Sequence, residues 1–209
     1  MQVQQPYSGW SLFVNVLVAI GTIGSVIVAL FGNWIRLTFF PPKLSIGLLN
    51  SEGEEIAITN SATGEAVDEA RYYHLIVSNS RRWFTATGVD VRLLQIEESA
   101  PGGGWRTTWR AVAPIQCRNQ ASNPLKHEIG SAMDFDICSV RKSGRLYLHP
   151  IIAPNNLKTN WNGPCDVILS LQARSTEVDT RVVRIRVSWD GKWHEGTKEM
   201  QDHFKIREE

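Results

Sequence analysis

The chain has 209 residues, and its 22 lysines and arginines almost balance 21 aspartates and glutamates, giving a formal net charge of +1. Nucleic-acid-binding proteins usually carry a strong basic excess, so the composition argues against that class and we expect no nucleic-acid partner. The three cysteines form an odd set without C-x-x-C spacing. A secreted disulfide framework needs an even set, so the cysteines favour a reducing compartment.

Residues 10–34 form one long apolar stretch between two tryptophans, Trp10 and Trp34, with no Asp, Glu, Lys or Arg inside it. About twenty apolar residues at a helical rise of about 1.5 Å cover the roughly 30 Å hydrocarbon core of a bilayer, and indole rings favour its two headgroup layers. A buried core helix would instead need an amphipathic stripe and a polar face. The sequence therefore predicts a transmembrane helix over residues 10–34, in contact with the lipid bilayer.

The flanks of this stretch predict its fate and orientation. Residues 1–9 contain no Lys or Arg, the apolar core is longer than that of a signal peptide, and no A-x-A cleavage pattern follows. We therefore expect a single-pass anchor in the inner or plasma membrane. Because Arg36 and Lys43 follow the span, the positive-inside rule places residues 1–9 on the non-cytoplasmic side and the C-terminal domain in the cytoplasm.

Residues 35–43 are expected to be a juxtamembrane linker, because Pro41 and Pro42 cannot continue a helix and favour an extended exit. Residues 44–209 are expected to form one soluble domain. Apolar and polar residues alternate there in short segments, which predicts half-buried strands. The segments are 44–48, 55–59, 72–79, 89–96, 133–137, 146–148, 167–171, 183–189 and 204–206.

Turn signals separate these segments. Residues 60–69 are predicted to be a polar loop, residues 102–104 the tip of a hairpin, and Asp190-Gly191 a two-residue hairpin turn. A helical turn over residues 197–203 is expected before a closing strand. With no long amphipathic helix after the span, the pattern predicts an all-β antiparallel sandwich, or a barrel, preceded by one N-terminal transmembrane helix.

The strand–loop–strand segment within residues 72–96 resembles a loose family of bacterial immunoglobulin-like β-sandwiches of the CARDB-like kind. That family shows apolar alternation, V-x-N-x, a small Ala and then V-x-V-x-L. The matching residues are Val77, Asn79, Ala86, Val89, Val91 and Leu93. Ser80 departs from the usual Gly, and residues 81–84 enlarge the loop. The resemblance, which covers about 25 residues, implies an immunoglobulin-like sandwich and no particular activity. The ending W-D-G-K-W…E-M…H-F-K-I, within residues 189–206, also looks like the C-termini of bacterial single-pass proteins with such a domain.

Patterns that would indicate catalysis or metal binding are incomplete. His127-Glu128 and His194-Glu195 could each begin an H-E-x-x-H zinc pattern, but neither has the second histidine. Cys117 has no nucleophile-elbow signature around it. The sequence therefore predicts a protein that is not an enzyme, with no catalytic, cofactor-binding or metal-binding residues.

Arg81, Arg82, Trp83 and Phe84 form the strongest candidate for a recognition site. Two guanidinium groups beside two aromatic rings can grip a phosphate, a nucleotide base or the carboxylate of a partner. In the alternative interpretation, Trp83 and Phe84 cap the end of the sandwich and both arginines are solvated.

The apolar stretch also carries a stripe of small residues. Gly21, Ser25 and Ala29 repeat as small-x-x-x-small, the spacing that lets two helix backbones approach closely in lipid. Asn15 and Thr22 fall on the same broad side, and an amide in hydrocarbon seeks a partner on a neighbouring helix. These five residues predict a homo-oligomer through the helix. The alternative is that small and polar residues are ordinary components of membrane helices.

Two functions remain open from the sequence. The first is a membrane-anchored binding or scaffolding module whose cytoplasmic domain recognises a protein or small ligand. The second is an oligomeric membrane effector or pore subunit gated by a ligand-sensing β-domain, as in bacterial defence systems.

Overall fold

A computed structural model describes residues 9–60, 62–118 and 125–209, and the chain divides into two compact units that meet between Pro41 and Pro42. The first unit is a single helix, α1 (Gly9–Phe39). Its window Gly9–Gly32 has a mean hydropathy of 2.4 and no buried residue, so α1 is long and apolar enough to cross a membrane. Apart from Gly9, the predicted tail 1–9 lies outside the described residues.

The helix continues past Trp34, where the predicted span ends, and runs through part of the expected linker to Phe39. The two prolines that follow cannot donate backbone hydrogen bonds, and the residue before a proline is biased away from helical angles. The helix accordingly ends just before Pro41 and Pro42.

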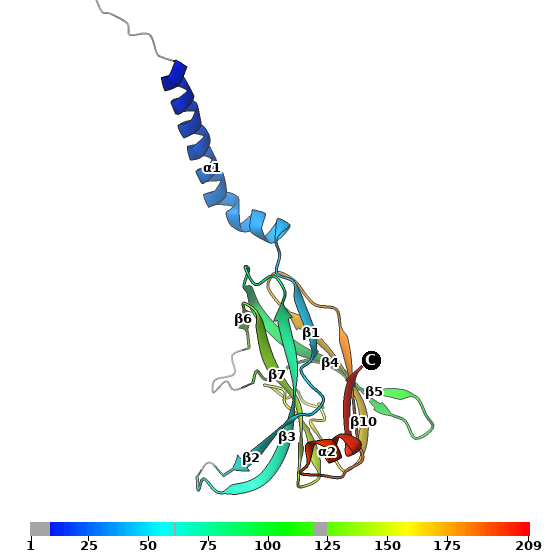
Figure 1. Ribbon diagram of the computed structural model, residues 1–209. Helices are drawn as coiled ribbons and strands as arrows, with labels where there is room; N and C mark the ends of the chain where they lie inside the picture. Colours follow the sequence, from blue (N-terminus) through cyan, green and yellow to red (C-terminus); the bar gives the residue numbers. More distant parts are fainter. Residues whose placement is uncertain (1–8, 61, 119–124) are drawn as a thin grey trace, which may run out of the picture. The chain divides into compact units, whose positions relative to one another are not determined.

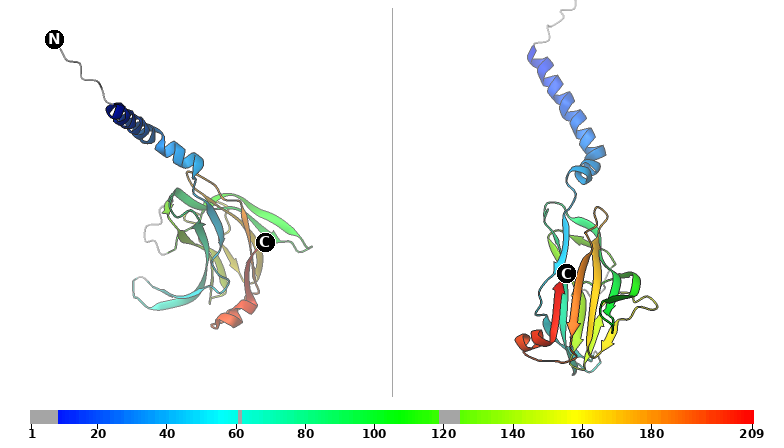
Figure 2. Two further views of the ribbon diagram at one scale, coloured as in Figure 1. Left: turned by 45° about the horizontal axis from the view of Figure 1, so that its top comes forward. Right: turned by 90° about the vertical axis from the view of Figure 1, so that its right-hand side faces the viewer.

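The second unit consists of two antiparallel sheets with one short helix, α2 (Thr197–His203), at one end (Figure 1 and Figure 2). The first sheet has the order β1 (Leu44–Leu48), β3 (Ala66–Asn79), β7 (Ala132–Arg141), β8 (Arg145–Leu148) and β9 (Asn160–Asn162), with β2 (Glu54–Thr59) also paired to β3. The second has the order β12 (Phe204–Glu208), β11 (Val183–Trp189), β10 (Cys165–Arg174), β4 (Ala86–Ser99) and β5 (Trp105–Pro114), with β6 (His127–Ile129) also paired to β4. The prediction of an all-β antiparallel sandwich after one apolar helix is confirmed.

One hydrophobic core lies between the two sheets. Ile185, Val187 and Trp189 of β11 point into it and alternate with more exposed neighbours, as the sequence pattern predicted. The six residues that match the family pattern are also buried: the five apolar ones are fully buried, and Asn79 is 2% exposed. Burial of apolar side chains at every second position is what fixes the register of such strands.

Two local predictions are wrong. Residues 60–69 are not wholly a loop, because β3 begins at Ala66 and pairs there with β2. Asp190-Gly191 is not a two-residue hairpin turn, since α2 lies between β11 and β12. Asp190 instead binds the end of α2: its Oδ2 lies 2.6 Å from Nδ1 of His203, and its N–H donates to the His203 carbonyl at 3.1 Å. The hairpin tip at residues 102–104 is confirmed, between β4 and β5.

Candidate functional site

The side chain of Asn79 holds the loop between β3 and β4, residues 80–85, in place. Its Oδ1 accepts hydrogen bonds from the backbone N–H groups of Lys43 at 3.2 Å and Arg81 at 3.1 Å. Its Nδ2 donates to the carbonyl oxygens of Phe84 at 2.5 Å and Ile129 at 3.4 Å. A buried amide needs partners for both its donor and its acceptor, and these four supply them. One side chain therefore joins the loop, the start of β1 and the end of β6.

This loop lies at the end of the domain where the chain enters β1, which we call the entry end. The N–H of Ser80 donates to the carbonyl of Lys43 at 3.0 Å, and Lys43 directly precedes β1. The N–H of Phe84 donates to the carbonyl of Arg81 at 3.0 Å and closes the loop as a turn. The start of β1 and the end of β3 can be followed to the same end of the domain in Figure 1.

The four side chains predicted to form the site differ in exposure. Trp83 is 90% exposed, and Arg81 and Arg82 are exposed as well. Phe84 is half-buried, and its backbone is fixed by Asn79. Trp83 therefore does not cap the sandwich, whereas Phe84 contributes to the base of the loop. The exposure of both arginines agrees with the other part of the alternative interpretation.

The adjacent loop between β10 and β11 brings two carboxylates to the same end, and both already have partners. The N–H of Thr176 donates to the carbonyl of Thr87 at 2.9 Å, which places this loop beside the start of β4. Glu177 accepts hydrogen bonds from the backbone and the hydroxyl of Thr87, the latter at 2.6 Å. Asp179 lies 3.6 Å from Arg174. Asp179 is thus paired with the end of β10, whereas Glu177, bonded only to neutral donors, keeps its negative charge beside the start of β4.

The five residues predicted to mediate helix association all lie in α1 and are exposed. The hydroxyls of Thr22 and Ser25 donate to the carbonyls of Val18 and Gly21, each at 2.8 Å, so both are satisfied within their own helix. A Cβ added at Gly21 would meet no atom within 4 Å. Among the described residues, the amide of Asn15 has no hydrogen-bond partner.

A polar cluster that the sequence analysis did not identify lies on the first sheet, on the side away from the core. His74 of β3 and Asp136 of β7 are cross-strand partners, with Nδ1 and Oδ1 2.8 Å apart. Glu54 approaches the other ring nitrogen of His74 at 3.6 Å. That nitrogen is buried without a hydrogen-bond partner within the described part of the chain. Only strand pairing brings these residues together, so no local motif could have revealed them.

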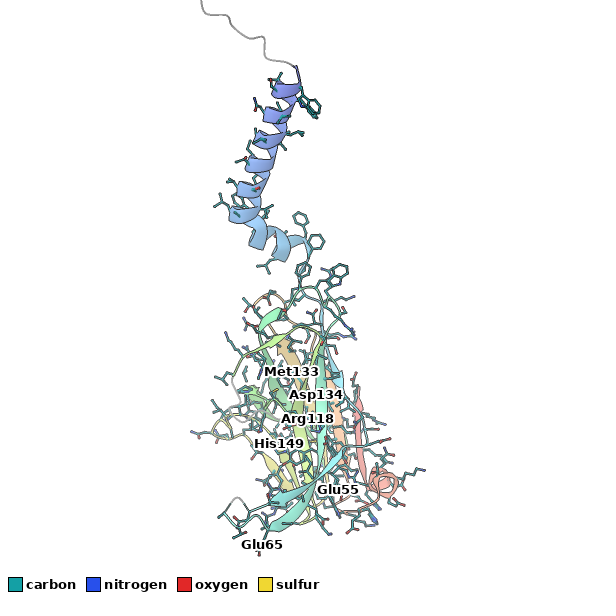
Figure 3. The ribbon with its side chains drawn as sticks, turned by 60° about the vertical axis from the view of Figure 1, so that its left-hand side comes forward. Glu55, Glu65, Arg118, Met133, Asp134 and His149 are labelled. Carbon is teal, nitrogen blue, oxygen red and sulfur yellow. The ribbon has the colours of Figure 1, made fainter. Side chains whose placement is uncertain are left out.

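The segment after β5 covers this cluster. The N–H of Arg118 donates to the carbonyl of Asp134 at 3.0 Å, and the N–H of Asp136 donates to the carbonyl of Gln116 at 2.9 Å. The guanidinium of Arg118 pairs with the carboxylates of Asp134 and Glu54. Figure 3 shows Arg118, Asp134 and His149 on this side of the domain. The cluster is thus a network of internal pairs beneath a covering segment.

His149 and Cys117 are not activated for acid–base or nucleophilic chemistry. Nε2 of His149 lies 2.8 Å from the hydroxyl of Ser139, which is fully buried. Burial lowers the pKa of His149 to about 4. Burial, helped by the charges of Asp136 and Asp134, raises the pKa of the Cys117 thiol to about 11. Since the thiolate is the reactive form, this cysteine is a poor nucleophile at neutral pH.

A small pocket of about 180 Å³ lies beside β9 and β10 and includes Glu98 and Cys165 in its lining. The Glu98 carboxylate accepts hydrogen bonds from Lys158 at 2.9 Å and from the Trp161 indole at 2.7 Å. Burial acts to raise the pKa of Glu98, but these hydrogen bonds outweigh it and the pKa is lowered. Such a carboxylate stays ionised and is unsuited to donate a proton. The described residues also contain no group of three or more His, Cys, Asp or Glu side chains placed to hold a metal ion.

At the end of the domain opposite the 80–85 loop, the buried Arg71 makes four hydrogen bonds. Its guanidinium donates to Glu55 at 2.7 Å and to the carbonyl of Glu195 at 2.9 Å. It also donates to the hydroxyl of Thr197 at 3.1 Å and to the carbonyl of Glu52 at 3.3 Å. These contacts fasten α2 and the start of β2 to β3, and we call this the closed end.

In comparison with known proteins, no family model matches the chain, and no curated protein matches it.

Proposed function

We propose that this chain is a single-pass membrane protein in which α1 anchors a cytoplasmic β-sandwich that recognises a protein or a small ligand. The observation that carries the proposal is the window Gly9–Gly32, which has a mean hydropathy of 2.4, no charged side chain and no buried residue. An apolar surface of this extent on a helix without a polar face is unstable in water and suits a hydrocarbon environment.

We also infer that the β-sandwich is immunoglobulin-like and related to the bacterial CARDB-like domains. All six residues that match the family pattern are buried, and the Asn of that pattern organises the β3–β4 loop. A pattern whose residues all serve the core is more specific than one scattered over the surface, because chance alternation does not require a buried Asn at the strand end.

The recognition site in this proposal is the loop of Arg81, Arg82 and Trp83, supported from below by Phe84. Binding rather than catalysis is favoured because burial raises the pKa of the Cys117 thiol and lowers the pKa of His149, which makes both groups less reactive at neutral pH. Exposed arginine and tryptophan side chains are the residue types that most often dominate binding surfaces.

The anchor and the orientation can be tested together in intact cells. The substitution Lys198→Cys places a thiol on exposed α2, and the unsubstituted protein, with its native cysteines, gives the background labelling. We expect the full-length protein to stay in the membrane after alkaline carbonate extraction. An impermeant maleimide should label the introduced thiol only after the cells are opened. Release by carbonate would contradict the anchor, and labelling of intact cells would contradict the cytoplasmic orientation.

The second candidate function, an oligomeric effector or pore subunit, is favoured by the unpartnered amide of Asn15 in the apolar window. Such an amide gains a hydrogen bond when a second helix supplies its counterpart. Overexpression distinguishes the two functions: a pore subunit depolarises the cells, whereas a binding module leaves the membrane potential unchanged.

A further inference from the structure

We infer that the loop of Arg81, Arg82 and Trp83 docks onto the anionic phospholipid headgroups of the bilayer that α1 spans. The inference rests on the proposed function, since it requires α1 to be a membrane anchor. It deepens that function by naming the partner of the loop as the lipid surface itself.

The connection between the anchor and the domain is short. Three residues separate Phe39, the last residue of α1, from Lys43. A chain extends at most about 3.6 Å per residue, so Lys43 stays within about 14 Å of Phe39 in any arrangement of the two units. Asn79 and Ser80 are hydrogen-bonded to Lys43, so the start of the 80–85 loop lies next to Lys43. Nearly the same maximum distance from Phe39 therefore applies to the start of the loop. The headgroup layer is therefore within reach of the loop.

The exposed side chains of the loop have the chemistry of a headgroup ligand. Arg82 is exposed and forms no ion pair with any described residue. Guanidinium groups bind phosphate through paired hydrogen bonds. Trp83 is 90% exposed beside it, and tryptophan, with an apolar body and a polar N–H, is enriched at the membrane interface. One loop thus presents a phosphate ligand and an interfacial anchor together.

The charge of the whole entry end acts in the same direction. Lys43 is exposed next to the loop, and Arg181 is exposed on the β10–β11 loop. Asp179 of that loop is paired with Arg174. Glu177 and Glu128 keep their negative charges, against the positive charges of Lys43, Arg82 and Arg181. Basic residues near an anionic membrane surface add to its attraction for a domain. The balance at this end favours a negatively charged surface.

The shape of the loop distinguishes a lipid surface from a protein groove or a free phosphate. Trp83 lies almost wholly in solvent rather than against a wall of the domain, so the loop projects instead of enclosing a ligand. Asn79 holds the loop and its supports through four hydrogen bonds, so little conformational entropy is lost on contact. A projecting, preorganised loop next to the membrane suits insertion between headgroups.

The experiment uses the full-length protein in nanodiscs of neutral phosphatidylcholine or of phosphatidylcholine with phosphatidylglycerol. Amide hydrogen exchange is measured by mass spectrometry for residues 80–85, with the exposed hairpin tip at residues 102–104 as the internal control. We expect exchange in residues 80–85 to slow about fivefold in the anionic discs, as expected when roughly one basic residue gains its headgroup attraction. Exchange at the tip stays unchanged.

Matched variants separate charge at the loop from charge in general. Arg82→Gln and Trp83→Ser should each remove the protection from exchange. Arg106→Gln removes one exposed positive charge from β5 and should leave the protection of residues 80–85 unchanged. All three positions are exposed, so folding is preserved, and thermal melts verify this.

Four other results would contradict the inference. Equal exchange in both discs, or protection in neutral discs from millimolar inorganic phosphate alone, would overturn the lipid assignment while leaving the anchor intact. Protection that requires added membrane proteins would assign the loop to a protein partner and overturn it as well. Failure of the chain to enter any disc would overturn the proposed anchor, and the lipid docking with it.

Discussion

The two ends of the β-sandwich each hold an arginine next to a turn, in opposite conditions. Arg71 at the closed end is 2% exposed and donates four hydrogen bonds to groups from β2 and the α2 region. Arg82 at the entry end is exposed and has no ion pair among the described residues. Residue type alone therefore does not indicate a binding site. What distinguishes the two arginines is whether other residues of the chain supply hydrogen-bond and ion-pair partners for the guanidinium group.

The contrast follows from what each end must do for the fold. At the closed end, Phe204 stacks on Tyr73 with ring centroids 4.2 Å apart, and Met200 of α2 is buried, so the core is sealed there by side chains. At the entry end, the buried Asn79 side chain forms hydrogen bonds with backbone groups of the 80–85 loop. The exposed side chains of Arg82 and Trp83 are consequently not needed for stability.

The substitution Arg71→Ala should be the most damaging. Removing the buried side chain leaves the carbonyls of Glu52 and Glu195 without their donor and empties the volume it fills, for a cost of about 3–4 kcal/mol. The Glu55 carboxylate is 41% exposed and becomes hydrated, so its lost ion pair adds little. Denaturant unfolding of the full-length protein in detergent measures it. The matched Arg82→Ala variant should change the unfolding free energy by less than about 0.5 kcal/mol. Equal effects of the two substitutions would remove the distinction between the ends.

A smaller loss of stability is expected from Asn79→Ala. It leaves the buried Ile129 carbonyl without one donor and releases the loop, for a cost of about 2–3 kcal/mol. Trypsin, which cleaves after arginine, should also cut at Arg81 and Arg82 faster than in the unchanged protein. Asn162→Ala, on the exposed part of β9, is the matched control and should alter neither property. A loop equally resistant to trypsin in the Asn79 variant would show that Asn79 does not organise the entry end.

The sequence was sufficient for the fold class because the strands follow local alternation, as in β11, where Val187 faces the core. It also located the loop at residues 81–84, since that run is contiguous. Local sequence patterns could not predict contacts between residues that are distant in the sequence. His74 and Asp136 meet only through the pairing of β3 with β7, and Arg71 finds its partners near α2. The hairpin prediction at Asp190-Gly191 failed for the same reason, because a contact with His203 outweighs the local turn preference.

A pH-dependent effect is expected from His149, whose partner, like those of Arg71, is internal. Burial lowers its pKa to about 4, against about 6.5 for an unperturbed histidine. Between these values the unfolded chain binds a proton that the folded chain does not, so the unfolding free energy falls as pH decreases from about 6.5 toward 4. We expect a loss of about 1–2 kcal/mol between pH 7 and pH 5 from this group.

The contribution of His149 is isolated by substitution. His149→Gln keeps a donor and an acceptor near the Ser139 hydroxyl but does not titrate, so the loss between pH 7 and pH 5 should shrink. His194→Gln, at an exposed position after β11, should leave the loss unchanged. The same pH dependence in both variants would show that other groups control acid stability.

The weakest effect is expected in α1, where the same distinction between satisfied and unsatisfied polar groups applies. The hydroxyls of Thr22 and Ser25 are bound to carbonyls of their own helix, whereas the Asn15 amide has no partner in the described chain. A second copy of the helix is the nearest source of one in lipid. Pairs of this kind contribute about 0.6–2 kcal/mol, so Asn15→Leu should lower the oligomer fraction severalfold in detergent crosslinking.

The small residues of α1 provide a second test of the same predicted helix–helix interface. Gly21 leaves open space on its side of α1, so Gly21→Ile fills the gap that would let a second backbone approach and should also lower the oligomer fraction. Thr22→Ala should have little effect because its hydroxyl already has a partner, and Ile27→Leu exchanges two apolar side chains of similar size. If Asn15→Leu behaves like Ile27→Leu, an unpartnered polar group in α1 does not indicate a missing partner, and the comparison drawn from Arg71 and Arg82 holds for the β-sandwich alone.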